Sequence, residues 1–260
     1  MCYDISFTVE IKQLSDYFPD LIFDNQLEMN FDGTHIIGHD YGEHPIIFKD
    51  RDDNKLHVKA MEWGCIPFYV KDHTTFQKQR ATMLNARSER ILEDDKSYWY
   101  KIRNRRCLIP LNGFYEHRKV TKFKRKVPYY INLIKQPMFF LPGLYSVTDL
   151  VDKETGEIKK VWSYTLITRN ANSVMKGIHN DGANKWRMPL LLPFELSKKW
   201  VEEDVSMEEY KAMLNFEMPS EELNYIPVYS IRTSEIRADN KRKNEYYEWE
   251  SLPELEINIP

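Results

Sequence analysis

The feature of this sequence that most restricts its fold is a series of short apolar runs, each closed by turn residues. Cys107 to Leu111 is such a run and ends at Asn112-Gly113, while Tyr129 to Ile134, Met138 to Leu141 and Ser163 to Thr168 are bounded by Pro, Gly or Asn. Short apolar runs between turn signals predict β-strands. The sequence therefore indicates a protein with several short strands.

Segments whose apolar residues recur at the spacing of a helix lie between these predicted strands. The alternating segment Ile5 to Val9 is followed by helical spacing over Ile11 to Phe18, and helices are also predicted over Ala171 to Lys176 and Met207 to Asn215. The last of these begins after Ser206, with a glutamate three residues on, which is a capping-box pattern. The order has no regular βαβ rhythm, and no glycine-rich phosphate loop follows a strand.

These patterns predict an α+β fold. We expect a single domain over residues 2–235, built around a curved, mainly antiparallel β-sheet or barrel with flanking helices, and a C-terminal tail over residues 236–260. With 260 residues, 42% of them apolar and 30% charged, the chain has enough core to fold without disulfides or a metal. The three cysteines, an odd and low number, favour a reducing compartment.

The chain shows no targeting signal. Its first residues lack the basic and apolar regions of a signal peptide, and its apolar stretches are far shorter than the ~20 residues of a membrane span. We therefore expect a cytoplasmic protein that does not interact with a membrane.

Charge is distributed unevenly, although the net charge is only −3. Residues 101–126 hold ten Lys and Arg against one acid, Glu116, whereas residues 202–222 hold eight acids against one lysine. The basic region could follow a phosphate backbone while the acidic one faces elsewhere. A solvated hairpin and a solvated helix are the alternative explanation.

Cys2 has a chemistry that internal cysteines lack. Methionine aminopeptidases generally remove Met1 when the second residue is small, so the mature chain is expected to begin at Cys2. An α-amine titrates near ~8 and a thiol near ~8.5, so both nucleophilic forms are accessible at neutral pH. The amine can condense with an aldehyde to an imine, and the thiolate can then close a thiazolidine ring on the same carbon.

Four further segments carry side chains suited to this chemistry: Trp63 to Pro67, Asn85 to Glu89, Asn112 to Glu116, and Thr168 to Pro189. Together with Cys2, and in this order, they closely resemble the SRAP family, named for SOS response-associated peptidases, whose members shield abasic sites in single-stranded DNA. The resemblance extends from Cys2 to about Val228.

The resemblance implies catalytic roles for four residues. Cys2 corresponds to the residue that crosslinks to the ring-opened sugar aldehyde, and Asn85 to a residue that orients that linkage. Glu116 corresponds to the acid that promotes ring opening and imine formation, and His179 to a proton-transfer partner. Neighbouring aromatic residues should raise the pKa of the Glu116 carboxyl, and a histidine titrates near neutral pH.

The residues expected to contact DNA are Trp63, Arg87, Arg105, Arg106, Thr168 and Arg187. Arg87 and Arg187 resemble the family's phosphate-binding arginines, Trp63 an aromatic that holds bases apart, and Thr168 a hydroxyl residue of the pocket. Arginine suits this task because its planar fork binds two phosphate oxygens. Arg105 and Arg106 come from the basic region.

The chain departs from the family pattern at four places, one of which is the segment Tyr41 to Pro45, where members usually have Tyr-Asn-x-x-Pro. Members commonly continue Met-Cys-Gly-Arg, whereas Tyr3-Asp4 stands here, so a basic group and a flexible glycine beside the nucleophile are missing. His117 replaces a common Trp, and Asn180 to Trp186 separates His179 from Arg187.

We expect a monomeric DNA-damage-response protein near the nucleoid or replication fork. Its partner would be single-stranded DNA containing abasic sites, and it would need no cofactor and no metal, because no Cys/His cluster has zinc spacing. Three alternatives remain open: an N-terminal-nucleophile cysteine amidohydrolase, a peptidase that releases its own Met1, and a non-catalytic single-strand-binding module. Cys65 and Cys107 are expected to be packing residues, and Trp63 and His179 could also be structural.

Overall fold

The computed structural model describes residues 2–25, 27, 33–151, 154–202, 204–233 and 237–257. Within them, strands predominate over helices. The strands are β1 (Asp4–Phe7), β2 (Ile22–Phe23), β3 (Gly33–Ile37), β4 (Glu43–Lys49), β5 (Leu56–Trp63), β6 (Asn85–Arg87), β7 (Arg106–Leu111), β8 (Gly113–Arg118), β9 (Val127–Leu133), β10 (Phe139–Val151), β11 (Ile158–Asn170), β12 (Arg187–Pro189) and β13 (Leu223–Pro227).

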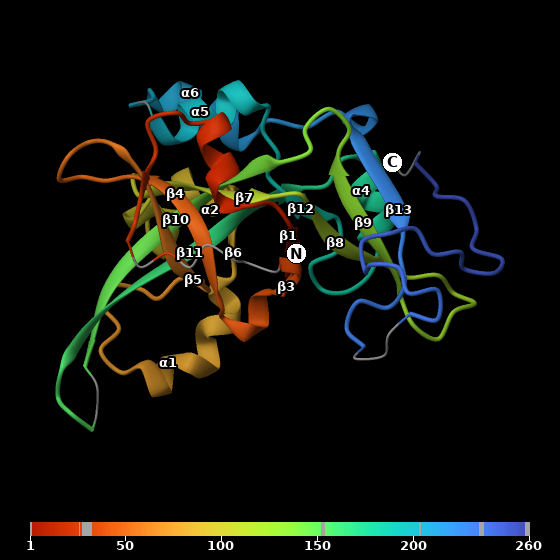
Figure 1. The fold of residues 1–260 in the computed structure, drawn as a ribbon, viewed down its shortest axis with the longest axis horizontal. Helices are drawn as coiled ribbons and strands as arrows, with labels where there is room; N and C mark the ends of the chain where they lie inside the picture. Colours follow the sequence, from red (N-terminus) through yellow and green to blue (C-terminus); the bar gives the residue numbers. More distant parts are fainter. Residues whose placement is uncertain are drawn as a thin grey trace.

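The helices are short and lie around the sheets (Figure 1). They are α1 (His73–Arg80), α2 (Glu89–Leu92), α3 (Tyr98–Lys101), α4 (Ser173–Ile178), α5 (Phe194–Glu202) and α6 (Met207–Leu214), with 3₁₀ turns at Ile11–Asp16, Gly38–Asp40, Ala81–Met83 and Ser220–Glu222. None of the helices in the described ranges is long and apolar enough to cross a membrane.

The larger sheet contains a closed ring of strands. Its order runs β12-β11-β10-β7-β4-β5-β2, and β11 also pairs with β5, so that β11, β10, β7, β4 and β5 form a barrel. The β11–β5 pair is parallel, and the other pairs of the ring are antiparallel. Because apolar side chains fill it, the barrel forms much of the core.

The smaller sheet has the order β13-β9-β8-β1-β3, and its pairs are antiparallel. The chain passes from the barrel into this sheet at Asn112, where β7 ends and β8 begins. Gly113 is required at this crossing, because a Cβ atom there would lie 2.3 Å from the ring of Tyr130. The crossing therefore fixes β8, and with it Glu116, beside β1.

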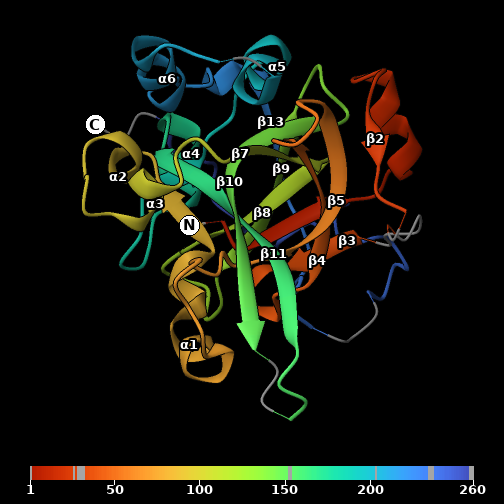
Figure 2. The same cartoon turned by 90° about the vertical axis from the view of Figure 1, so that its left-hand side faces the viewer.

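The predicted α+β class with a mainly antiparallel sheet and barrel is confirmed. The capping box at Ser206 is also present, with the Ser206 side chain and Glu209 bonding each other's backbone. Two predicted strands were too short. Phe139 to Leu141 of the segment Met138 to Leu141 begins β10, and Ser163 to Thr168 is part of β11, and each of these strands is 13 residues long. The outer ends of this hairpin extend beyond the body of the molecule (Figure 2).

The C-terminal segment folds back onto the smaller sheet. Arg118 of β8 donates to the carbonyl oxygens of Pro253 and Glu254, both at 2.7 Å, and Trp249 donates to the Val228 carbonyl. The Glu256 carbonyl lies so close to Gly177 of α4 that a Cβ there would approach it to 2.8 Å. The described part of the predicted tail therefore packs against the strands and the helix that hold the candidate site.

Candidate functional site

The first strand places Cys2 beside Glu116. β1 pairs with β8 through Asp4–Tyr115 and Ile5–Phe114, so the residues before Asp4 run alongside Glu116. Cys2 is fully buried, and its thiol contacts the Asp4 carbonyl at 3.8 Å. Burial, with Glu116 and Asp4 nearby, raises the pKa of the Cys2 thiol well above its ordinary value. A thiol in this environment stays protonated at neutral pH.

Asn85 holds the first residues of the chain in place. It begins β6, which pairs in parallel with β11 at Leu166. Its side-chain amide Nδ2 donates to the Cys2 carbonyl at 3.0 Å. Its Oδ1 is buried and has no hydrogen-bond partner among the described residues, so it is available to a donor that enters the site.

Glu116 and His179 face each other. His179 follows α4, and its Nε2 lies 3.9 Å from Glu116 Oε2, with both side chains at most 10% exposed. His179 Nδ1 lies 2.8 Å from the Arg187 carbonyl, which can only accept, so Nδ1 carries the proton and Nε2 of the neutral ring is the acceptor that faces Glu116. The structure thus brings Cys2, Asn85, Glu116 and His179 together.

Burial shifts the pKa values of Glu116 and His179 in opposite directions. Desolvation, with a contribution from Asp4, raises the pKa of Glu116 to about 7, and desolvation lowers the pKa of His179 to about 4. At neutral pH the histidine is therefore uncharged, while the carboxyl is close to half-protonated. A proton donor and a proton acceptor then stand at the same site.

A pocket of about 350 Å³ opens at these residues. The pocket is lined by Tyr3, Asp4, Glu116, His117, Lys126, His179, Asp181, Gly182, Ala183, Asn184 and Arg232. Residues 180–186, which separate His179 from Arg187 in the sequence, therefore contribute part of the pocket wall. A pocket of this size can hold one sugar and the adjoining phosphates of a nucleic acid, but not a large ligand.

Two of the expected phosphate-binding residues have different surroundings. Arg87 is exposed, and its Nη2 donates at 2.9 Å to Asn184 on the pocket wall. Arg187 is buried and pairs with Glu89, and it also donates to Asn170 Oδ1 at 2.9 Å and to the Thr168 carbonyl at 2.7 Å. Arg87 is thus accessible to DNA, whereas Arg187 acts as a structural link between strands.

Thr168 and Trp63 are both in the interior. Thr168 is fully buried on β11, and its backbone carbonyl accepts a hydrogen bond from Arg187 Nη2. Trp63 is 1% exposed, its indole N–H donates to the Leu84 carbonyl at 3.0 Å, and its ring lies nearly parallel to Tyr164. A Cβ atom on Gly38 would lie 3.2 Å from the same ring. In this arrangement no face of Trp63 is presented to a base.

The basic region 101–126 is divided between two parts of the molecule. Arg106 lies at the start of β7, over the rings of Trp200 and Tyr210, and Arg105 precedes it near Tyr145. Lys126, at the other end of the region, lines the pocket and pairs with Asp181 at 2.9 Å. The crossing from β7 to β8 carries the two ends apart, and neither Arg105 nor Arg106 is among the residues that line the pocket.

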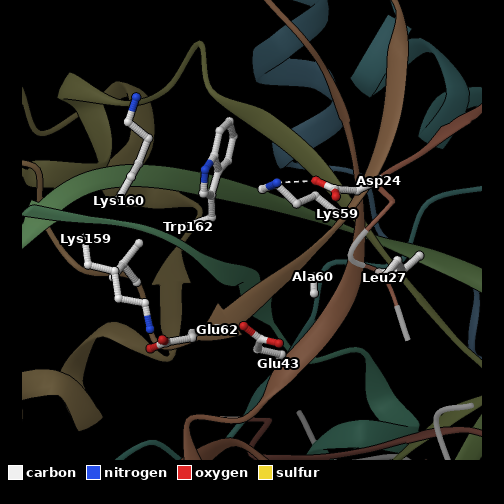
Figure 3. A pocket seen from close by; sticks show the side chains of 10 residues that line it. Asp24, Leu27, Glu43, Lys59, Ala60, Glu62, Lys159, Lys160 and Trp162 are labelled. Carbon is white, nitrogen blue, oxygen red and sulfur yellow. Dashed lines mark hydrogen bonds and ion pairs between the residues drawn. The ribbon is translucent and has the colours of Figure 1, made fainter. Parts of the chain in front are cut away.

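A second pocket, of about 190 Å³, lies on the barrel at β5 and β11 (Figure 3). Lys59 pairs with Asp24 and lies 5.4 Å from the ring centroid of Trp162. The figure shows carboxylates of Glu43 and Glu62 on the same wall. Among the described residues that line this second pocket, three carboxylates and three lysines offset one another in charge, and none is a cysteine, serine or histidine.

Sequence reasoning missed three features of the surface. Arg232 and Lys126 belong to the pocket, but each is brought there by long-range folding and no local motif marks it. Phe68, Tyr69 and Tyr98 form a cluster of mutually tilted rings, of which the first two are 43% and 58% exposed. The signal for this cluster was the aromatic pair that follows Pro67.

Within the described ranges, no group of three or more His, Cys, Asp or Glu could hold a metal ion. Cys65 and Cys107 are both buried in the core, and burial raises the thiol pKa of both, although the hydroxyl groups of Ser163, Tyr98 and Ser146 lie beside Cys65. These two cysteines have the environment of packing residues.

The chain is similar to several known proteins. The family model described as SOS response associated peptidase (SRAP) matches residues 1–232. "Abasic site processing protein YoqW" of Bacillus subtilis is 32% identical over 155 residues, which are 60% of this chain and 61% of YoqW. "Abasic site processing protein HMCES" of Xenopus tropicalis is 27% identical over 210 residues, 75% of this chain and 58% of that one. The chain thus spans about three-fifths of each relative.

A solved structure has the same fold over nearly the whole chain. A protein from Bacteroides thetaiotaomicron superposes with a TM-score of 0.72 at 26% identity, covering 94% of this chain and 97% of that one. A Bordetella bronchiseptica protein superposes with a TM-score of 0.66 at 17% identity, covering 88% of this chain and all of that one.

Proposed function

Because the chain belongs to the SOS response associated peptidase (SRAP) family, we propose that it processes abasic sites in DNA. In its finer form, the proposal is that Cys2, exposed as the N-terminus by removal of Met1, crosslinks to the ring-opened aldehyde of an abasic site in single-stranded DNA. The observation that carries this proposal is that Glu116 and His179 line one pocket, while Cys2, whose carbonyl is held by Asn85, lies buried close to Glu116.

The chemistry balances without a cofactor. The Cys2 amine adds to the aldehyde carbon and the adduct loses water to form an imine. The thiol then adds to the imine carbon, its proton goes to the nitrogen, and a thiazolidine ring is complete. Protonated Glu116 would donate to the sugar oxygen that leaves the anomeric carbon during ring opening, and Nε2 of His179 would accept a proton from the reacting groups.

The raised pKa of the Cys2 thiol favours this order of steps. A cysteine amidohydrolase attacks first with sulfur and needs an activated thiolate, which a buried thiol beside two carboxyl groups opposes. A thiol that acts second, on an imine already attached to its own residue, needs no such activation because the reaction is intramolecular. Release of Met1 by the protein itself would require the same early thiolate.

Contacts with single-stranded DNA would come from accessible groups at the pocket wall and elsewhere on the surface. Arg87 is placed to bind a phosphate at the wall, and the exposed rings of Phe68 and Tyr69 offer stacking surfaces of the kind that bind bases without sequence preference. Trp63 and Arg187 would support the pocket from within, through Leu84 and through Glu89 and Thr168.

The test is incubation of Met1-processed protein with an abasic single-stranded oligonucleotide, followed by denaturing electrophoresis. Wild-type protein should give a heat-stable adduct, Cys2→Ala none, and the control Cys65→Ala the wild-type amount, because Cys65 is a packing residue. Absence of an adduct with wild-type protein would refute the crosslinking proposal. Hydrolysis of small amides through a thioester would instead support the amidohydrolase.

A further inference from the structure

A carboxylate two residues from the nucleophile binds an arginine from the far end of the chain. Asp4, whose side chain is 4% exposed, accepts from Arg232 Nη2 at 2.7 Å and from Nε at 3.3 Å. His35 Nε2 contacts the same carboxylate at 2.8 Å. Burial acts against ionisation of Asp4, but these two partners outweigh it and hold its pKa below the ordinary value. Asp4 is therefore a buried anion that fixes Arg232.

The guanidinium itself is half in solvent. The Arg232 side chain is 48% exposed and lines the pocket together with Glu116, His179 and Lys126. Its Nε and Nη2 face Asp4, whereas Nη1 has no hydrogen bond to any of the described residues. One edge of the planar group is thus anchored to the protein, and its remaining donors are directed away from that anchor.

We infer that Arg232, oriented by Asp4, binds the DNA backbone phosphate next to the abasic sugar in this pocket. The inference rests on the proposed function and adds a phosphate-binding residue to it. An arginine fixed along one edge loses little conformational freedom on binding an anion, and its remaining N–H groups suit phosphate oxygens. Lys126, the other long cation that lines the pocket, is already paired with Asp181.

The pair also supplies a cation where the sequence lacks one. Tyr3-Asp4 stands where a basic group beside the nucleophile was expected from the resemblance. Because Asp4 binds Arg232, which is 228 positions away in the sequence, a guanidinium is present at Asp4, two residues after Cys2. His35 Nε2 contacts the same carboxylate, so Asp4 has a second partner besides Arg232.

The experiment measures binding of a single-stranded oligonucleotide that carries a tetrahydrofuran abasic analogue, which has no aldehyde and cannot crosslink. Arg232→Gln should weaken binding about tenfold, and the slope of log affinity against log salt should fall by about 0.7, the value for one lost phosphate contact on a single strand. Lys135→Gln, which removes an exposed cation paired with Glu222, should change neither. Asp4→Asn, which keeps Arg232, should retain the wild-type slope.

The double variant Asp4→Asn/Arg232→Gln separates phosphate binding from a purely structural role. Because it leaves no orphaned carboxylate, it should fold as the wild type does and still bind as weakly as Arg232→Gln. Recovery of wild-type affinity and slope in the double variant, or an unchanged slope in Arg232→Gln, would overturn the inference. Reaction of each protein with the aldehyde-bearing oligonucleotide tests the proposed function separately. Wild-type protein that forms no adduct would refute that function. The salt dependence of binding would still show whether Arg232 contacts a phosphate.

Discussion

Burial of Glu116 has a consequence for stability that can be measured without DNA. The side chain is 5% exposed, and desolvation raises the pKa of its carboxyl from 4.5 to about 7. The perturbation is Glu116→Gln, which keeps the shape of the side chain and removes its ionisation. The comparison of the two proteins isolates the titration of this one group, because the other ionisable residues are shared.

The sign and size follow from proton binding. Below pH 4.5 the carboxyl is protonated in the folded and the unfolded chain, so the two proteins should have similar stability. Between pH 4.5 and about 7 only the unfolded chain releases the proton, and wild-type protein loses about 1.4 kcal/mol per pH unit relative to Glu116→Gln. The difference should level off above pH 7, at about 3 kcal/mol in favour of the glutamine variant.

The assay is urea denaturation of both proteins at pH 5, 6, 7 and 8, with the free energy of unfolding extrapolated to water. The stability of the variant relative to wild-type protein should increase across this range. The variant should also fail to form the adduct, because the ionisable carboxyl that lowers stability is the group that transfers the proton. A stability difference that does not change with pH, or one that grows toward acid, would refute a raised pKa for Glu116.

Three further outcomes are expected. Asn85→Ala should lose about 1 kcal/mol of stability with the hydrogen bond to the Cys2 carbonyl, and it should form the adduct more slowly in a gel time course while its DNA affinity stays at the wild-type level. His179→Gln should resist acid better than wild-type protein in melting experiments, because the lowered pKa of His179, about 4, makes wild-type stability fall as the pH drops from 6.5 through 4. Arg187→Ala should lose roughly 3 kcal/mol in urea denaturation, since it removes the buried guanidinium that binds Glu89, Asn170 and the Thr168 carbonyl. A variant of wild-type stability that binds DNA weakly would instead make Arg187 a phosphate ligand.

Local patterns predicted the strands well but not their closure. Apolar runs with turn residues marked β7 and β9, because side-chain alternation and turn chemistry are local properties. The barrel closes through the parallel pair of β11 with β5, at Ser163–Glu62 and Tyr164–Trp63, and no local pattern encodes a pairing between residues so far apart. The outer ends of β10 and β11 mix polar and apolar residues, so the apolar runs did not reveal the full length of these strands.

The chemical core of the site was visible in sequence because its members lie in short motifs. Glu116 lies in β8, which pairs with the first strand, and Asn85 begins β6, which pairs with β11 and from which its amide reaches the Cys2 carbonyl. Roles that depend on exposure were harder to predict. The sequence does not show whether an aromatic residue before a turn, such as Trp63, is buried or exposed, and the structure shows that Trp63 is buried in the core. Arg232 reaches the pocket only because Asp4 is buried there, and this is a property of the fold.

The most direct measurement of the central claim is the intact mass of the protein before and after mixing with an abasic single-stranded oligonucleotide. The account predicts a protein that lacks Met1, and an adduct whose mass is the sum of protein and DNA less one water, the water released when the imine forms. The adduct should be absent with Cys2→Ala. An adduct that forms on protein retaining Met1, or a processed protein whose mass does not change, would contradict the account.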